Sequence, residues 1–403
     1  MKAVFNLGKW ARLKGAFALV FVGSCLCYAF ELPFWCYFIS PVLLAFFIFQ
    51  YMSSDHNKAI KAYATGDWKT FLEVCERTIA KTPQDANAHA NAAFALANLH
   101  RFEEALQSVE KARSLGGDEK QCHLFSAMAN CGMHKYDETI SDCTKAIELN
   151  KEEPSPYLIR SIALTQTYKY EQALQDVDQV EKLNSNLTIA KTYRAYVYHA
   201  MYRLDEAQKE YEPIFGTLSH AELPFGLIVR SYVQARLGKV DAAIEDMKRA
   251  VETMPKKHEG YLDLAYFHVL KGDATNANRY LELVEPGDSF VESYRNSHQA
   301  RILLMSKDES KAQDNTNLAV EHAKRAADLR PHSADARAVY GIALSRLGQH
   351  ADGLIKLKSA IDIDPYCAEA FWWRGEVHEK LGELEKAEAD KKVAKDFGYL
   401  PYL

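Results

Sequence analysis

The chain has 403 residues, and its 54 acidic and 49 basic side chains give a formal net charge of −5. This slightly acidic balance provides no electrostatic basis for general nucleic-acid binding. No glycine-rich phosphate loop, GxSxG nucleophile motif or HExxH metal-binding helix occurs in the sequence. We therefore predict a protein that is not an enzyme, requires no cofactor or metal, and binds no nucleic acid.

The amino-terminal segment is apolar and follows a basic stretch. Residues 16–51 are almost wholly apolar and are interrupted only by Glu-Leu-Pro at 31–33. The basic side chains before them are Lys2, Lys9, Arg12 and Lys14. We predict a membrane anchor over residues 1–52, preferably a helical hairpin with passes at 15–30 and 34–51. The alternatives are a single span with an interfacial companion and a cleaved secretory signal.

The length of the first pass argues against a hairpin, whereas the placement of the aromatic residues argues for it. The first pass would be only about 23 Å long, which is short against a hydrocarbon core of about 30 Å. Aromatic residues, however, mark the ends of the segment and its central break: Trp10, Tyr28, Trp35, Tyr37 and Tyr51. Such belts mark membrane interfaces and favour a turn at the break. Residues 22–25, Val-Gly-Ser-Cys, loosely resemble a bacterial lipoprotein cleavage box, but the segment after them stays apolar.

The side of the membrane on which the rest of the chain lies depends on this choice. The basic amino terminus should stay in the cytoplasm, so a hairpin returns the chain there and a single span exports it. Beyond the anchor lie five cysteines without disulfide-like spacing: Cys75, Cys122, Cys131, Cys143 and Cys367. Unpaired thiols suit a reducing compartment. We expect a bacterial inner membrane and a cytoplasmic main domain, and the periplasmic side remains the alternative.

Beyond the anchor, small or apolar residues recur at one phase with a nearly constant period. The ten positions are Phe71, Ala105, Thr139, Ala173, Ala207, Ala243, Ala277, Ala319, Gly353 and Ala387. Seven of the nine spacings are 34 residues, and the other two are 36 and 42. A period of 34 with small residues at a fixed phase is the signature of a helix–turn–helix repeat array.

The order of residues within each period adds a family resemblance. An aromatic or long side chain comes first, followed by a small pair, a turn and a further small residue, most clearly in residues 88–112, 227–255 and 368–394. This pattern resembles the tetratricopeptide repeat (TPR) superfamily from Met52 to Phe397. The resemblance implies an all-α, right-handed TPR solenoid of about ten repeats over residues 53–403. The apolar segment adds the expectation of an N-terminal transmembrane helix or helical hairpin before it.

Glycine, proline and two insertions punctuate the repeats. The glycines that follow the first helix of a repeat at one phase are Gly66, Gly238, Gly272, Gly348 and Gly382. There a left-handed residue can end the helix without a steric clash. The prolines at the end of the second helix are Pro83, Pro255, Pro331 and Pro365. The longer spacings place an insertion near 219–223 and a polar insert, expected as a surface loop, near 306–315.

Arginine and acidic residues also recur at fixed phases. The arginines Arg160, Arg194 and Arg230 lie at one phase of the first helix, and the acids Asp142, Asp176 and Glu210 at one phase of the second. TPR families with this pattern often pair the two. We predict structural ion pairs between neighbouring repeats: Asp142–Arg160, Asp176–Arg194 and Glu210–Arg230. A basic stripe for an acidic ligand is the alternative.

The resemblance also implies that the first helices line the concave side of a superhelix. The predicted partner-binding groove consists of Phe94, Met128, Ile162, Tyr196, Tyr232, Tyr266, Phe225, Leu262 and Trp372. A contiguous apolar row indicates a binding surface, and tyrosine and tryptophan are typical anchors. The alternative is that these side chains fill a tightly curled superhelix or pack between neighbouring first helices.

These features predict a membrane-anchored scaffold that binds a protein or peptide segment of a partner in the concave groove. Assembly, secretion or envelope work is the expected setting. The alternatives are an exported periplasmic TPR assembly factor or lipoprotein, and a non-catalytic subunit of an enzyme complex. The cysteines and histidines near residues 122–143 match no zinc-binding spacing, so no metal site is predicted there.

Overall fold

The structure is a computed structural model that describes residues 55–183, 187–215, 224–253, 258–306, 309–399 and 401. The predicted anchor, residues 1–52 with its passes at 15–30 and 34–51, lies outside these residues, as does the insertion near 219–223. None of the helices in the described ranges combines the length and the apolar character that crossing a membrane requires.

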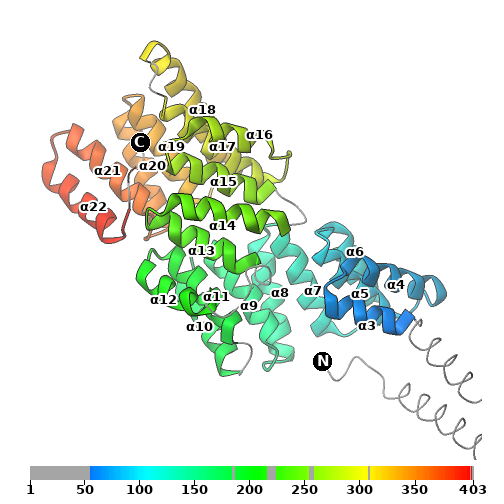
Figure 1. The fold of residues 1–403 in the computed structure, drawn as a ribbon. Coiled ribbons are helices and arrows are strands. Elements are labelled where there is room, and N and C mark those ends of the chain that lie inside the picture. Colours follow the sequence, from blue (N-terminus) through cyan, green and yellow to red (C-terminus); the bar gives the residue numbers. More distant parts are fainter. Residues whose placement is uncertain are drawn as a thin grey trace, which may run out of the picture. The chain divides into compact units, whose positions relative to one another are not determined.

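The described part of the chain is built from ten consecutive helix pairs, which fall into two compact units, 1–118 and 119–403. The first unit contains α3 (Asp55–Thr65), α4 (Trp68–Lys81), α5 (Ala86–Asn98) and α6 (Phe102–Ser114). In every pair the odd-numbered helix is the first helix of a repeat and the even-numbered helix is the second (Figure 1).

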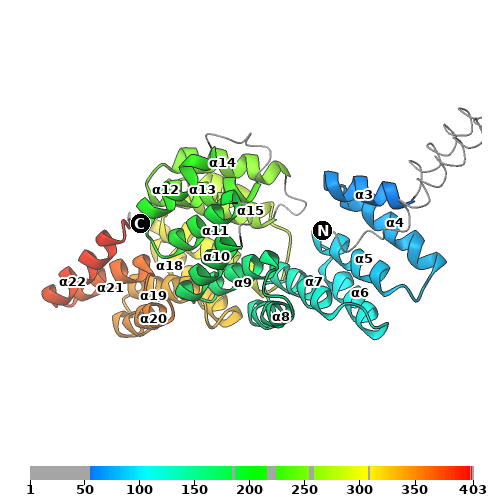
Figure 2. The same cartoon turned by 90° about the horizontal axis from the view of Figure 1, so that it is seen from below.

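The second unit contains the remaining eight pairs (Figure 2). Its first four pairs are α7 (Glu119–Gly132) and α8 (Tyr136–Leu149), α9 (Pro154–Gln166) and α10 (Tyr170–Lys182), α11 (Leu187–Ala200) and α12 (Leu204–Phe215), and α13 (Pro224–Arg236) and α14 (Val240–Thr253). Its last four are α15 (His258–Leu270) and α16 (Ala274–Glu282), α17 (Ser289–Leu304) and α18 (Ala312–Leu329), α19 (Ala334–Arg346) and α20 (His350–Ile363), and α21 (Ala368–Lys380) and α22 (Leu384–Asp396). The predicted all-α repeat array is confirmed.

Small residues at the repeat phase let the two helices of a pair approach closely. Ala105, Thr139 and Ala173 are fully buried, and the other members of the set follow the same pattern. The helices α19 and α20 approach so closely that a Cβ added to Gly353 would lie 2.2 Å from the Ser345 hydroxyl oxygen. A side chain at this position would force the two helices apart, because real Cβ contacts essentially never fall below about 3 Å.

The turn between the two helices of a pair ends in a left-handed residue. The predicted glycines Gly66, Gly238, Gly272, Gly348 and Gly382 all have positive φ. Four further repeats hold an aromatic or histidine residue there instead: His100, His134, Tyr168 and Tyr202, with φ between 55° and 61°. The left-handed conformation of a residue with a Cβ costs roughly 1–2 kcal/mol. We call these four residues the aromatic turn residues.

The polar insert is only partly a loop. After Ser306 the chain forms a short 3₁₀ turn over Glu309–Lys311, and α18 already begins at Ala312. The helix is therefore 18 residues long, compared with 14 for α20. The prediction of a surface loop near 306–315 is wrong for residues 312–315, because Ala312 and Gln313 are good helix formers and extend the helix away from the core.

Candidate functional site

Three tyrosines on successive first helices of the second unit form the centre of the predicted groove. Tyr196 lies on α11, Tyr232 on α13 and Tyr266 on α15. We call them the tyrosine row. Tyr196 is buried, whereas Tyr232 and Tyr266 are half-buried. They come from one phase of the repeat, so the superhelical arrangement of first helices places them on one side of the unit.

Each member of the row is tied to the first helix beside it. The Gln166 side-chain amide on α9 donates a hydrogen bond to the Tyr196 hydroxyl. The Tyr232 hydroxyl donates to Asp263 Oδ2 on α15 at 2.8 Å, and the Tyr232 ring stacks on His199 of α11 with 5.1 Å between centroids. The row thus bridges neighbouring first helices and does not stand free on an open surface.

The third tyrosine continues the pattern to α17. The Tyr266 ring stacks on His298 with 5.4 Å between the ring centroids, and the Arg301 guanidinium lies 5.3 Å from the centre of the same ring. Burial lowers the pKa of His298 to about 3, helped by the nearby charge of Arg301. The imidazole is therefore neutral at physiological pH and serves as a flat stacking partner.

Burial also perturbs the acidic partner of the row. Burial raises the pKa of Asp263 to about 7, although the hydrogen bond from Tyr232 acts in the opposite direction. Burial likewise lowers the pKa of His199 well below its ordinary value, and the charge of Arg236 adds to this. The Nδ1 atom of His199 is buried and is among the described polar atoms that have no hydrogen-bond partner. Polar groups are therefore held in this interior at a free-energy cost.

The other predicted groove residues are also drawn into the packing. Leu262 is buried, and Met128, Ile162, Phe225 and Trp372 are half-buried. Phe225 packs against Tyr196, with 5.6 Å between the ring centroids. Phe94 belongs to the first unit, where it is half-buried against Tyr63 and Trp68. The open apolar groove is thus not what the structure shows, because the side chains pack between neighbouring first helices.

The aromatic turn residues of the second unit reach repeats that are distant in sequence. The His134 ring stacks on Phe290 with centroids 3.7 Å apart, and its Nδ1 atom lies 2.9 Å from the Asp288 carboxylate at the start of α17. The Tyr168 hydroxyl accepts a hydrogen bond of 2.9 Å from the backbone N–H of Ala334, the first residue of α19. These contacts join residues 154 or more positions apart in the chain.

A second group of contacts extends the same seam. The Tyr170 hydroxyl donates to Asp364 Oδ1 at 3.2 Å, and the Tyr170 ring packs edge-on against Tyr366. Tyr202 packs on Phe397 just beyond α22, with 6.2 Å between the ring centroids. The turns that follow α7, α9 and α11 therefore lie against α17, α19 and the end of α22, and we call this set of contacts the closure seam. It closes the second unit on itself.

A buried arginine joins three successive first helices on the later side of the seam. Arg301 on α17 has 0% of its surface exposed. It donates hydrogen bonds to Asp335 at 2.5 Å and to Glu369 at 2.7 Å, on α19 and α21. Although burial opposes ionisation, Arg301 holds the pKa of Asp335 below its ordinary value. A guanidinium between two carboxylates is satisfied on both sides, which a buried charge requires.

The predicted ion pairs form with different partners. Arg160 binds Asp176 through two hydrogen bonds of 2.8 and 2.7 Å, and Arg230 binds Asp246 in the same way. Arg194 binds Asp178 and Glu181 and lies 3.6 Å from Glu210. The predicted pairs Asp142–Arg160, Asp176–Arg194 and Glu210–Arg230 are therefore wrong. The two helices of one pair are antiparallel, which brings residues 16 positions apart face to face within a repeat.

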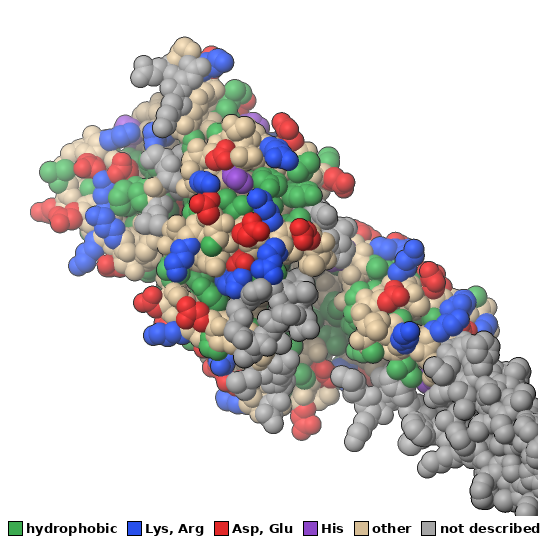
Figure 3. All heavy atoms as spheres, in the orientation of Figure 1, with side chains coloured by type: hydrophobic (Ala, Val, Ile, Leu, Met, Phe, Trp, Pro, Cys, Tyr) green, Lys and Arg blue, Asp and Glu red, His purple; other side chains and the backbone are tan. Residues whose placement is uncertain are grey.

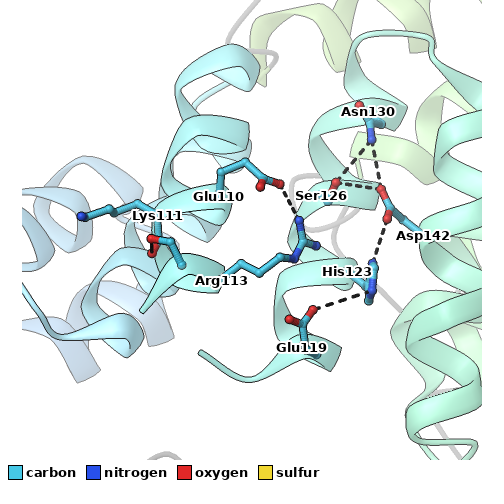
Figure 4. A network of polar contacts seen from close by, with 9 residues as sticks. Glu110, Lys111, Arg113, Glu119, His123, Ser126, Asn130 and Asp142 are labelled. Atoms are coloured by element: carbon cyan, nitrogen blue, oxygen red, sulfur yellow. Dashed lines mark hydrogen bonds and ion pairs between the residues drawn. The ribbon is translucent and has the colours of Figure 1, made fainter. Parts of the chain in front are cut away.

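In the repeat of Asp142, which lacks the arginine, other side chains provide the hydrogen-bond partners of the carboxylate (Figure 4). Ser126 stands where Arg160 stands one repeat later, and its hydroxyl donates to Asp142 at 2.7 Å. The His123 Nδ1 atom lies 2.9 Å from the same carboxylate, and the Asn130 amide donates to it at 3.1 Å. The hydroxyl is bound to the carboxylate and not to the imidazole, so the geometry is that of a fixed acid and not of a nucleophile with its base.

Comparison with known proteins agrees with the architecture. A family model described as tetratricopeptide repeat matches residues 310–368. This match and the ten helix pairs in phase along the described residues give the chain the architecture of a TPR array. Its architecture is that of a scaffold for protein–protein interaction. None of the curated proteins matches the chain.

Several solved structures are similar to this chain. The human IFIT1 dimer with PPP-AAAA is 16% identical with a TM-score of 0.50, over 85% of this chain and 82% of that chain. The Cut9–Hcn1 hetero-tetramer of the APC/C is 12% identical with a TM-score of 0.49, over 87% and 74%. TTC0263, a TPR protein of Thermus thermophilus, is 18% identical with a TM-score of 0.37, over 43% and 90%. At these identities the likeness concerns the fold alone.

Proposed function

We propose that the chain is a membrane-anchored scaffold that binds a segment of a partner protein at the tyrosine row of its second unit. The anchor is the apolar segment within residues 1–52, the membrane is a bacterial inner membrane, and the repeats lie in the cytoplasm. The scaffold acts in assembly, secretion or envelope work. That the chain has no enzymatic activity and binds no nucleic acid stays a prediction.

The chemical make-up of the tyrosine row is the observation that supports this site. Other buried positions of the same unit are aliphatic, as at Val177 and Val180, both fully buried. The row instead carries phenol, imidazole and carboxylate groups, including Asp263 with its raised pKa and the unpaired Nδ1 of His199. Packing alone gains nothing from such groups, since buried polar atoms cost free energy. Perturbed titratable residues beside aromatic side chains are typical of binding sites.

A partner segment that uses the row has to exchange hydrogen bonds with it. In the structure the Tyr232 hydroxyl donates a hydrogen bond to Asp263, and the Tyr196 hydroxyl accepts one from Gln166. A peptide can replace these internal partners with its own backbone groups, which leaves the number of hydrogen bonds unchanged. The phenol rings then supply contact area at low entropic cost.

Photo-crosslinking in the intact membrane tests the site. The photoreactive residue p-benzoylphenylalanine is placed at Tyr232 in the full chain, and in a matched control at Ile355, which is 62% exposed on the second helix α20. We expect one defined adduct from position 232 and none from position 355. The same adduct from both positions, with helical circular dichroism intact, would exclude the row as the site.

The hydroxyl group provides the second arm of this test. Tyr232→Phe keeps the ring and removes only the donor, and we expect it to weaken binding of the crosslinked partner about fivefold. Tyr280→Phe on α16 is the control and should bind as the wild type does. Equal binding by both variants would count against the row.

A high-salt wash and protease access test whether the chain is anchored in the membrane and on which side the repeats lie. We expect the chain to remain with the membrane after a high-salt wash and the repeats to be cut only in inverted vesicles. Cutting in intact spheroplasts would place the repeats in the periplasm. Release of the chain from the membrane by the high-salt wash would show that it has no membrane anchor.

A further inference from the structure

The first helix of the described array, α3, carries an apolar face that none of the described repeats covers. On α3, Ile60 is 37% exposed and Tyr63 is 42% exposed, while Ala62 is buried. Ile60 stands one period before Phe94, at a phase that packs against the preceding repeat elsewhere in the array. Solenoids need a cover at their ends, because each repeat buries its faces only against neighbours.

The exposed face is aromatic at its centre. Tyr63 lies 5.8 Å, between ring centroids, from Trp68 and also from Phe94, and both of these rings are half-buried. Tyrosine and tryptophan are amphipathic and are enriched where a protein meets the headgroup region of a bilayer. The composition of the face therefore fits a bilayer interface better than an aqueous surface.

The charges around the face are basic. Lys58 and Lys61 are both exposed on α3. The one acidic side chain of the helix, Asp55, is paired with Arg77 at 3.3 Å and with Lys81 at 3.0 Å. These cations lower the pKa of Asp55 and neutralise it, so α3 presents a net positive rim in a chain of net charge −5. Such a rim is attracted to anionic headgroups.

The sequence fixes how far α3 can lie from the predicted anchor. The apolar segment ends at Tyr51, and α3 begins at Asp55, so only Met52, Ser53 and Ser54 separate them. Four Cα–Cα steps span at most about 14 Å. This is about twice the thickness of one headgroup layer, so α3 must begin close to the membrane surface.

We propose that α3 lies on the membrane surface, with Ile60 and Tyr63 in the headgroup region and Lys58 and Lys61 contacting anionic lipids. This inference rests on the membrane anchor of the proposed function and adds a second, peripheral contact. The bilayer then covers the exposed end of the array in place of a capping repeat. The first unit is thereby held against the membrane by a helix face in addition to its chain connection.

Lipid photo-labelling of the full chain tests this contact. The chain is reconstituted into phosphatidylcholine vesicles with and without phosphatidylglycerol, each doped with a lipid that carries a diazirine near its headgroup. We expect adducts on residues 55–69, in higher yield with phosphatidylglycerol, and none on α6. Adducts on residues 1–54 without any on residues 55–69 would overturn the α3 contact and leave the anchor standing. A chain that does not float with the vesicles would overturn the anchor itself.

Paired variants separate a lipid contact from other covers of the same face. Ile60→Ser with Tyr63→Ser should reduce labelling of residues 55–69 several-fold while labelling of residues 1–54 stays constant. The control pair, Leu381→Ser with Leu384→Ser, alters two apolar residues of the second unit that are even more exposed, and it should change neither. Unchanged labelling of residues 55–69 in the first pair would overturn the proposal. Protection of Lys58 and Lys61 from acetylation in detergent at high dilution would also overturn it, because it would indicate that another segment of the chain covers this face.

Discussion

At the scale of single residues, the second unit is unusual in how many charged and polar groups it buries. Arg301 is held between Asp335 and Glu369, and Asp263 is bound to Tyr232. Ion pairs of this kind seldom add net stability over an apolar core, yet removing one partner is strongly destabilising. They therefore favour one arrangement of the first helices over others that an aliphatic interior would also permit.

The arginine gives the largest expected effect. Arg301→Ala strands the buried carboxylate of Glu369 and the half-buried carboxylate of Asp335, so the free energy of unfolding should fall by about 3–5 kcal/mol. Arg301→Lys keeps the charge but loses the planar geometry that reaches two carboxylates, and it should lie in between. Urea unfolding of the full chain in detergent measures both. A loss below about 1 kcal/mol for Arg301→Ala would mean that the arginine is solvated in solution.

The raised pKa of Asp263 makes stability depend on pH. Its pKa is about 7 in the folded chain and about 3.9 in the unfolded chain. Between these values the folded state binds the extra proton, so this group's contribution is complete at low pH and is lost as the pH rises from about 4 to about 7.

The variant Asp263→Asn isolates this contribution from those of other carboxylates. The difference in unfolding free energy between wild type and Asp263→Asn should change by about 1 kcal/mol per pH unit within that window. Urea titrations at a series of pH values measure it. A difference independent of pH would show that Asp263 is ionised in the folded protein.

These residues mark the limit of what the sequence could predict at this scale. The period identified the tyrosines, but their polar partners lie on other first helices, so no fixed spacing along the chain reveals them. A weaker signal was present, since His199 and Asp263 lie one helical turn from Tyr196 and Tyr266. The partners of the arginines were assigned wrongly because the period gives the phase of each residue and not which neighbouring helix faces it.

At the scale of elements, the turns between paired helices reverse the chain direction, and some of them also make contacts with distant repeats. Where a repeat has glycine, the left-handed turn residue only ends the helix. Where it has His134, Tyr168 or Tyr202, the side chain also reaches a distant repeat. The backbone strain is tolerated because the long-range contact compensates for it.

Two matched substitutions test this reading of the turns. Tyr168→Gly relieves the strain but loses the hydrogen bond to Ala334 and the packing of the ring, so the second unit should become less stable by about 1–2 kcal/mol. His100→Gly relieves the same strain in the first unit, where the ring contacts the nearby Phe102. It should be neutral or stabilising by up to about 1 kcal/mol. Stabilisation by Tyr168→Gly would mean that the seam contact contributes little.

The same turns show where sequence reasoning stopped short. The phase that holds Gly66 and Gly238 also holds His100, His134, Tyr168 and Tyr202, all of which the 34-residue period locates. An aromatic residue at a position that favours glycine was therefore a readable signal of a tertiary contact. The contacted residues, such as Phe290 and Ala334, could not be found in this way, because the curvature of the array determines which repeats meet.

At the scale of the whole molecule, the two units differ in how completely their apolar side chains are covered by other residues. The second unit closes on itself through the seam, and its predicted groove residues are covered by each other. The first unit has two repeats and leaves the aromatic face of α3 exposed. The repeat number and helix order followed from the sequence (Figure 1), whereas the closure did not, because it depends on small rotations summed over many repeats.

The surface of the described residues carries mixed charge with scattered apolar side chains (Figure 3). No large field of a single sign is visible on the face shown in Figure 3, which suits a protein that recognises its partner by specific contacts. The tyrosine row and α3 then have separate tasks. In the proposed function the row binds a partner segment, and in the further inference α3 holds the first unit at the bilayer.

A distance across the closure seam tests the account most directly. Spin labels on Lys169 and His332 flank the hydrogen bond between Tyr168 and Ala334, and both side chains are exposed. Pulsed electron paramagnetic resonance of the full chain should give one short, narrow distance distribution, which broadens and lengthens in Arg301→Ala. A broad distribution at long distance in the wild type would show an open solenoid and would contradict the closed second unit.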